Sequence, residues 1–159
     1  MKSRKIIFNI FLIILGLECI KCSMLKKERH ELKKDLRRMH KLFSIANYWL
    51  LLDIGGDKLG MKIEKKGYQT VAIYGMGELG IRFIEELKLN TSVNVLYGID
   101  RNADRISTYI PVYKLEDIQK KQSPELVIIT AYGIDEWLKD NIRKAVGCDI
   151  VSIEELING

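Results

Sequence analysis

Short apolar runs rich in β-branched residues recur along the chain from residue 68 onward. They occupy residues 70–74, 93–99, 110–113, 125–130 and 149–151. Helical spacing of apolar residues follows the first, third and fourth runs, and Ser152 is placed to cap a last short helix. Alternating strands and helices are typical of a parallel sheet with right-handed crossovers. We therefore predict an α/β, Rossmann-like domain over residues 68–159, with an open parallel five-stranded sheet in the order 3-2-1-4-5.

An N-terminal helical arm is predicted over residues 23–67, as one long helix to about residue 52 and a short one before Gly67. The long helix carries an apolar stripe with spacings of three and four. Its members are Leu32, Leu36, Met39, Phe43, Ala46 and Leu50; toward the N-terminus Arg29 breaks the stripe, and Leu25 follows at the next position. Two roles fit the stripe: packing against the Rossmann-like domain, or pairing with a second copy or a partner protein through residues 25–50.

Residues 1–22 form an apolar N-terminal segment, in which residues 6–20 follow a basic start. The apolar run is shorter than the roughly 20 residues of a membrane span. It fits a membrane anchor or interfacial helix, a signal peptide or a packed helix, and it is also explained if Met24 is the true start. Basic residues follow the run as well, so insertion would keep the remaining chain in the cytoplasm.

The net charge of +5 is unevenly distributed. Residues 1–41 hold 12 Lys and Arg against 4 Asp and Glu, whereas the remainder holds 14 against 17. The domain itself is therefore mildly acidic, and we expect no nucleic-acid partner. We expect a cytoplasmic protein, in which the basic residues 1–41 either contact an acidic surface at the inner face of the membrane or are simply solvated. The cysteines Cys19, Cys22 and Cys148 form neither a disulfide framework nor a four-ligand metal site, and a reducing cytosol fits them.

A glycine-rich turn follows the first predicted strand directly. Its residues are Gly75, Met76, Gly77, Glu78, Leu79 and Gly80. In this pattern the first glycine allows a tight turn, the second lets backbone approach phosphates, and the third lets the helix lie close to the strand. The first amides of the helix, which lack intrahelical partners, then face an anionic ligand. The turn predicts a phosphate-binding loop.

Further site residues are predicted at the carboxyl ends of two other strands. Asp100 ends the second strand and is placed to accept hydrogen bonds from ribose hydroxyls, with Arg101 beside it for a phosphate. Thr130, Ala131 and Tyr132 follow the fourth strand, next to the point where the strand order reverses. We predict that these residues line one crevice with the glycine turn.

Residues 68–157 resemble the Rossmann-like domains of bacterial cell-surface polysaccharide biosynthesis. The resembling stretches are residues 73–80, 97–102, 111–113, 127–130 and 150–156, with a looser likeness at 47–50. Similar domains precede sugar O-acyltransferases, where they hold a nucleotide sugar, or follow sugar C-methyltransferases. The resemblance implies phosphate and ribose roles for Gly75, Gly77, Gly80 and Asp100, but this chain carries no transferase module.

Catalytic residues are not evident. None of the seven tyrosines has a lysine four positions later, the pair used by short-chain sugar dehydrogenases, and both histidines lie in the arm. The sequence therefore favours a non-catalytic module that binds a nucleotide such as NAD(P) or a UDP-sugar. The alternative is an NAD-dependent sugar-nucleotide oxidoreductase or epimerase, and a third hypothesis is a scaffold that binds no nucleotide.

Overall fold

Five parallel strands form the centre of the protein. The computed structural model describes residues 15–159 in full and residues 2–14 by their backbone alone. The strands are β1 (Thr70–Tyr74), β2 (Asn94–Ile99), β3 (Val112–Tyr113), β4 (Leu126–Ile129) and β5 (Asp149–Ser152). Their order is β3-β2-β1-β4-β5, which confirms the predicted open sheet. Because all pairs are parallel, the five carboxyl ends share one edge, where open α/β sheets bind ligands.

Helices precede and connect the strands. They are α1 (Lys2–Ile54), α2 (Leu59–Lys65), α3 (Glu78–Asn90), α4 (Glu136–Val146) and α5 (Ile153–Asn158), with the 3-10 helices η1 (Ala103–Arg105) and η2 (Leu115–Lys120). The long helix predicted from residue 23 to 52 lies inside α1. The predicted N-cap Ser152 begins α5 with a capping box, in which its hydroxyl accepts from the Glu155 amide while the Glu155 carboxylate accepts from the Ser152 amide.

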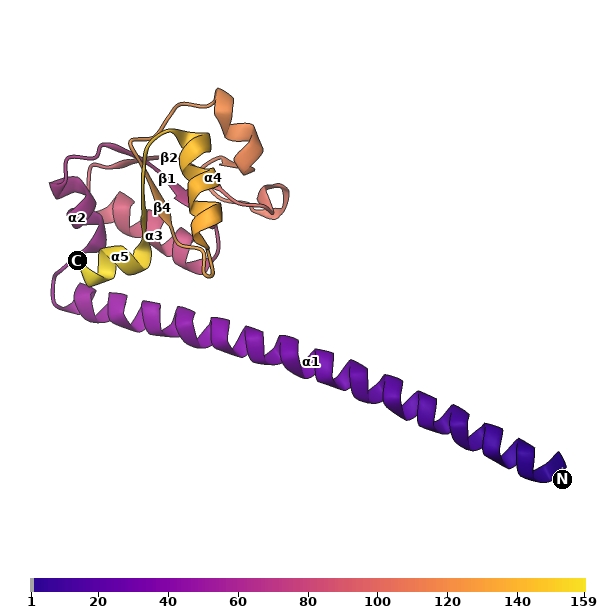
Figure 1. Ribbon diagram of the computed structural model, residues 1–159. Helices are drawn as coiled ribbons and strands as arrows, with labels where there is room; N and C mark the ends of the chain where they lie inside the picture. The colour runs from indigo at the N-terminus through magenta and orange to yellow at the C-terminus, as the bar shows by residue number, and fades with distance from the viewer. Residues whose placement is uncertain (1) are drawn as a thin grey trace. The chain divides into compact units, whose positions relative to one another are not determined.

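The alternation of side chains along β1 explains the two apolar layers. Val71 and Ile73 point into the layer beneath α2, α3 and α5, whereas Ala72 and Tyr74 point into the layer beneath α4 and η2. Figure 1 shows the helices on both sides of the sheet. Burial on both faces accounts for the continuous apolar character of β1 and β4 in the sequence.

The chain divides into two compact units, Met1–Lys41 and Leu42–Gly159, and each is described by itself. The first unit consists of the N-terminal part of α1. The second holds the sheet together with the last turns of α1 and all of α2, whose Leu59 and Ile63 are fully buried. Residues 42–67 therefore belong structurally with the sheet, although the sequence pattern grouped them with the arm.

A buried carboxylate joins three helices within the second unit. Glu86 on α3 accepts hydrogen bonds from the indole nitrogen of Trp49 on α1 and, at 2.7 Å, from the backbone nitrogen of Gly60 on α2. The Trp49 ring also packs edge-on against Phe83, with 5.6 Å between ring centroids. Both bonds to the carboxylate are charge-assisted and the bond to Gly60 is buried, so this junction fixes the end of α1 and the start of α2 on α3.

Within the second unit, the residues that pack α1 on the core are not those of the predicted apolar stripe. Its members Phe43 and Leu50 are 67% and 55% exposed, whereas the neighbouring Ile45 is buried and Trp49 packs on the core. Packing against the sheet is therefore wrong as a role for these stripe residues. In the described part of the chain no helix is both long and apolar enough to cross a membrane. Most of the apolar segment 1–22, for which a membrane anchor is one of several predicted roles, lies outside the residues whose side chains are described.

Candidate functional site

The glycine loop, residues 75–80, lies between the end of β1 and the start of α3. β1 is paired with β2 on one side and with β4 on the other. The connection from β1 to β2 runs through α3 on one face of the sheet, whereas the connection into β4 runs through η2 on the opposite face. This is the switch point at which open α/β sheets form a crevice. The loop therefore stands where the sequence predicted it, at the carboxyl edge of the sheet.

Two of the three loop glycines are required by close packing. Gly75 has a φ of +97°, and a Cβ there would lie 2.6 Å from the Ala131 Cβ. A Cβ on Gly80 would lie 2.2 Å from the carbonyl oxygen of Gly75. The buried Thr130 hydroxyl donates to that same oxygen at 2.6 Å. Thr130 and Ala131, which follow β4, thus pack directly against the backbone of Gly75 at the start of the loop.

The middle glycine is different, because it faces open space. A Cβ on Gly77 would meet no atom within 4 Å, and its φ of −78° and ψ of −170° suit any residue. Gly77 is the N-cap of α3 and no side chain caps this helix. Within the described residues, the backbone nitrogens of residues 77–80 have no hydrogen-bond acceptor. Four unpaired donors and the positive end of the helix dipole therefore lie at the start of α3, where Gly77 and Glu78 are exposed and Gly80 is buried.

The side chain of Asp100 is hydrogen-bonded to the backbone of the glycine loop. Its Oδ2 accepts from the backbone nitrogen of Met76 at 2.9 Å, and its Oδ1 accepts from that of Asn102 at 2.8 Å. The Met76 side chain is buried and covers Gly98, where a Cβ would lie 2.3 Å from the Met76 sulfur. Asp100 and Met76 therefore organise the loop. A carboxylate has about four acceptor positions, so Asp100 retains capacity for further donors.

The remaining predicted residues lie at the surface around the loop. Glu78, Arg101 and Tyr132 are exposed, and Leu79 is half-buried against the core. Tyr74, which sequence reasoning did not select, ends β1 beside them. Burial raises the pKa of its phenol, the charge of Arg101 lowers it and that of Asp100 raises it again. The sequence feature that could have identified Tyr74 is its position directly before the first glycine of the loop.

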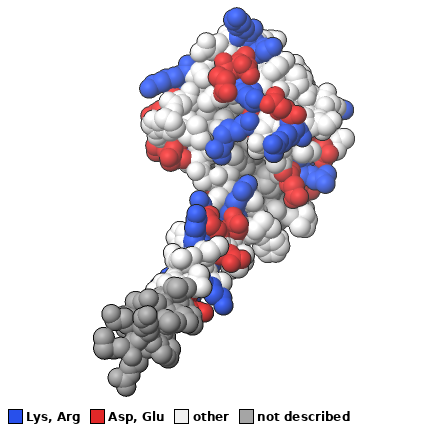
Figure 2. All heavy atoms as spheres, turned by 90° about the vertical axis from the view of Figure 1, so that its right-hand side faces the viewer, with Lys and Arg blue, Asp and Glu red and all other residues white. Residues whose placement is uncertain are grey.

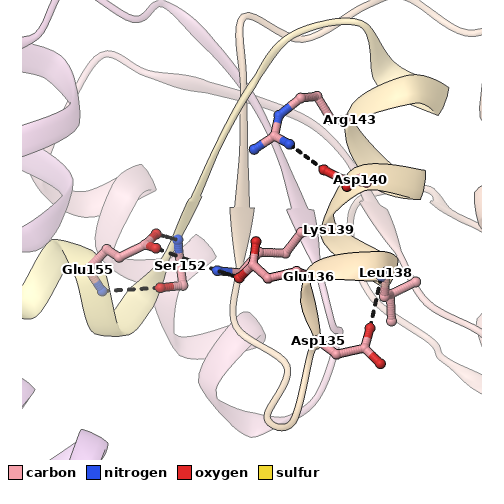
Figure 3. A network of polar contacts seen from close by, with 8 residues as sticks. All are labelled: Asp135, Glu136, Leu138, Lys139, Asp140, Arg143, Ser152 and Glu155. Carbon is pink, nitrogen blue, oxygen red and sulfur yellow. Dashed lines mark hydrogen bonds and ion pairs between the residues drawn. The ribbon is translucent and has the colours of Figure 1, made fainter.

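A separate pocket of about 250 Å³ opens along α4 and β5. Figure 3 shows its polar network. Lys139 pairs with Glu136 at 3.0 Å and Glu155 at 3.6 Å, and Arg143 pairs with Asp140 at 2.7 Å. The hydrogen bond to Glu136 raises the pKa of Lys139. Each cation of this pocket already has a carboxylate partner, so the network ties α4 to α5 and is a poor site for an anion.

A second hollow of about 440 Å³ runs between the end of α1 and α3, where Trp49 and Leu89 contribute to its wall. It lies along helices rather than at the ends of the strands. Figure 2 shows acidic and basic side chains interspersed over the face that it draws. The unpaired amides of the glycine loop thus remain the strongest candidate site. Comparisons of the chain with protein-family models, with curated proteins and with solved structures gave no match.

Proposed function

We propose that the sheet domain binds the phosphates of a nucleotide or nucleotide sugar on the glycine loop. The observation that carries the proposal is the set of unpaired backbone nitrogens at residues 77–80, beside a glycine that leaves room for a ligand. Such a cradle supplies hydrogen bonds and a favourable potential to phosphate oxygens without any charged side chain.

The ribose would lie toward the end of β2. Asp100 is held by two backbone nitrogens and keeps acceptor positions for sugar hydroxyls. Arg101 and Tyr132 are exposed beside the loop and are available to a second phosphate and to the base or sugar. Arg101 is the residue that would distinguish a 2′-phosphate, as in NADP(H), from a free hydroxyl.

The proposed activity is binding rather than catalysis. Backbone groups would hold the phosphates, the polar side chains Asp100, Arg101 and Tyr132 are proposed as ligand contacts, and the two histidines of the chain, His30 and His40, lie on α1. The likeness to Rossmann-like domains of polysaccharide biosynthesis supports an accessory role in that pathway. The basic residues 1–41 support a place at the cytoplasmic face of a membrane.

A ligand panel tests the proposal. The full chain would be titrated with ADP, UDP, a UDP-sugar, NAD(H), NADP(H) and inorganic pyrophosphate, with heat release and melting temperature as readouts. A ligand at ten times its Kd adds about 1.4 kcal/mol to the unfolding free energy, which raises the Tm by several degrees. Arg101→Ala is expected to weaken NADP(H) more than NAD(H).

The outcomes separate the alternatives. Binding of nucleoside diphosphates without turnover supports the proposal. Binding restricted to nicotinamide nucleotides, with turnover of a sugar nucleotide, would instead identify an oxidoreductase or epimerase. Absence of any shift across the whole panel would contradict nucleotide binding.

A further inference from the structure

An exposed apolar face of α1 within residues 22–39 has no role in the sheet domain's site. Its large side chains are all more than half exposed: Leu25 (55%), Leu32 (68%), Leu36 (68%) and Met39 (63%). These positions are separated by three and four residues in alternation, and Cys22 and Arg29 occupy the remaining positions of that series. In heptad terms Cys22, Arg29 and Leu36 are a positions, and the others are d positions. A face that recurs every 3.5 residues on average is the seam of a left-handed coiled coil.

The charges beside this seam indicate its partner. Glu28 and Asp35 lie on one side, at g positions, and Lys26 and Lys33 lie on the other side, at e positions. None of the four has an interaction partner within the described part of the chain. In a parallel, in-register pair each g residue faces the e residue five positions later in the other helix, so Glu28 meets Lys33 of the second copy.

The antiparallel arrangement is disfavoured by the same residues. It brings g beside g and e beside e, so acidic side chains would face acidic ones and Lys33 would face lysines. The parallel pair has two repulsive contacts, Lys21 with Lys26 and Arg29 with Arg29 of the second copy, and its complementary contact is Glu28 with Lys33, which forms twice in the symmetric pair. The asymmetric placement of acids and lysines therefore selects a second copy of this chain, oriented in parallel.

We propose that two copies of the protein pair through a parallel, in-register, two-stranded coiled coil over residues 22–39. Leu25, Leu32, Leu36 and Met39 pack in its core. Arg29 limits the assembly to two strands, because a charged side chain at a single a position reaches solvent past one partner helix but not past several. The pairing surface lies outside the glycine loop and does not depend on nucleotide binding.

The oligomeric state tests the apolar seam. Sedimentation equilibrium of the full chain is expected to show a dimer, and Leu36→Asp is expected to raise the dimer Kd about 100-fold or more, since it places a charge in the seam. Ile20→Asp is the matched control. Ile20 is an exposed apolar residue at an f position of the same helix, 59% accessible. Its substitution makes the same chemical change and should leave the dimer intact.

The orientation is tested by charge and by cross-linking. Glu28→Lys and Lys33→Glu should each weaken the dimer about fivefold, and the double variant should restore it. Treatment with diamide should cross-link Cys22 of one copy to Cys22 of the other, because parallel a positions face each other. Cys22→Ser should abolish this product, whereas Cys19→Ser, at an e position, should not.

Three results would overturn the proposal. The first is a monomer at tens of micromolar, which would assign the face to a different protein. The second is a dimer that Leu36→Asp and Ile20→Asp affect equally. The third is a dimer that resists Cys22 cross-linking and is not rescued by the double charge exchange.

Discussion

The two ends of α3 differ in whether their polar groups have hydrogen-bond partners. At the C-terminal end polar groups are paired: the Glu86 carboxylate accepts from Trp49 and Gly60, and the side chains of Asn90 and Thr91 donate to the carbonyls of Glu86 and Leu87. At the N-terminal end no side chain caps the helix. One end of the helix therefore stabilises the fold, while the other keeps its donors available.

The two helices that follow β4 and β5 begin differently from α3. Asp135 caps α4 by accepting from the Leu138 nitrogen at 2.8 Å, and Ser152 with Glu155 caps α5. A glycine N-cap costs only a few tenths of a kcal/mol relative to Ser, Asp or Asn. At α3 this small loss is combined with an N-cap residue, Gly77, that leaves the helix donors unobstructed, as the proposed phosphate site requires.

The closed part of the loop should give the largest stability effect. Gly80→Ala places a Cβ against the Gly75 carbonyl and is expected to lower the unfolding free energy by about 3 kcal/mol. Urea denaturation measures the loss. Gly77→Ser is the control and should change stability by less than about 0.5 kcal/mol, since its Cβ meets no neighbour. Equal losses at both glycines would remove the distinction between the closed and open parts of the loop.

Substitutions at the C-terminal end of α3, where the polar groups are paired, should give the next largest loss of stability. Glu86→Ala leaves the Trp49 indole and the Gly60 nitrogen without an acceptor and should cost about 2–3 kcal/mol. Glu86→Gln retains one acceptor oxygen and should cost less. Trp49 fluorescence during denaturation reports both changes. Glu85→Ala, a surface neighbour that pairs with Arg82, should have little effect, and a comparable loss there would contradict the role of Glu86.

A smaller effect is expected at the open end. Glu78 supplies a negative charge in the first turn of α3, which stabilises the helix but repels a phosphate. Glu78→Gln should lower stability by about 0.5 kcal/mol and raise the affinity for UDP about threefold. Glu136→Gln makes the same change in the first turn of α4 and should leave UDP affinity unaltered. If both variants alter affinity alike, the effect does not originate at the loop.

The sequence predicts what depends on local pattern. Apolar runs and glycine spacing located the five strands, their order and the loop, because strand alternation and turn geometry are properties of neighbouring residues. The packing of Gly75 and Gly80 follows from the same spacing. Asp100 was selected by its position at the end of β2, although its bond to the Met76 nitrogen was not foreseen.

What depends on distant contacts was not predicted. Glu86 lies in a helical pattern of charged residues and resembles a solvated side chain, yet it is buried by Trp49, 37 positions earlier. Residues 42–67 join the sheet unit through Ile45, Leu59 and Ile63, which are buried against residues distant in the sequence. Periodicity identifies the apolar stripe of α1 but cannot decide which neighbouring face meets the core, and that face is marked by Ile45 and Trp49.

One variant tests the open end of α3 most directly. Gly77→Asp introduces a favourable N-cap whose carboxylate takes the amide donors that a phosphate would use. We expect stability to stay constant or rise by a few tenths of a kcal/mol, while calorimetric affinity for ADP and UDP falls more than tenfold. Unchanged affinity in a stably folded Gly77→Asp protein, or no affinity in the parent chain, would contradict the loop as a phosphate site.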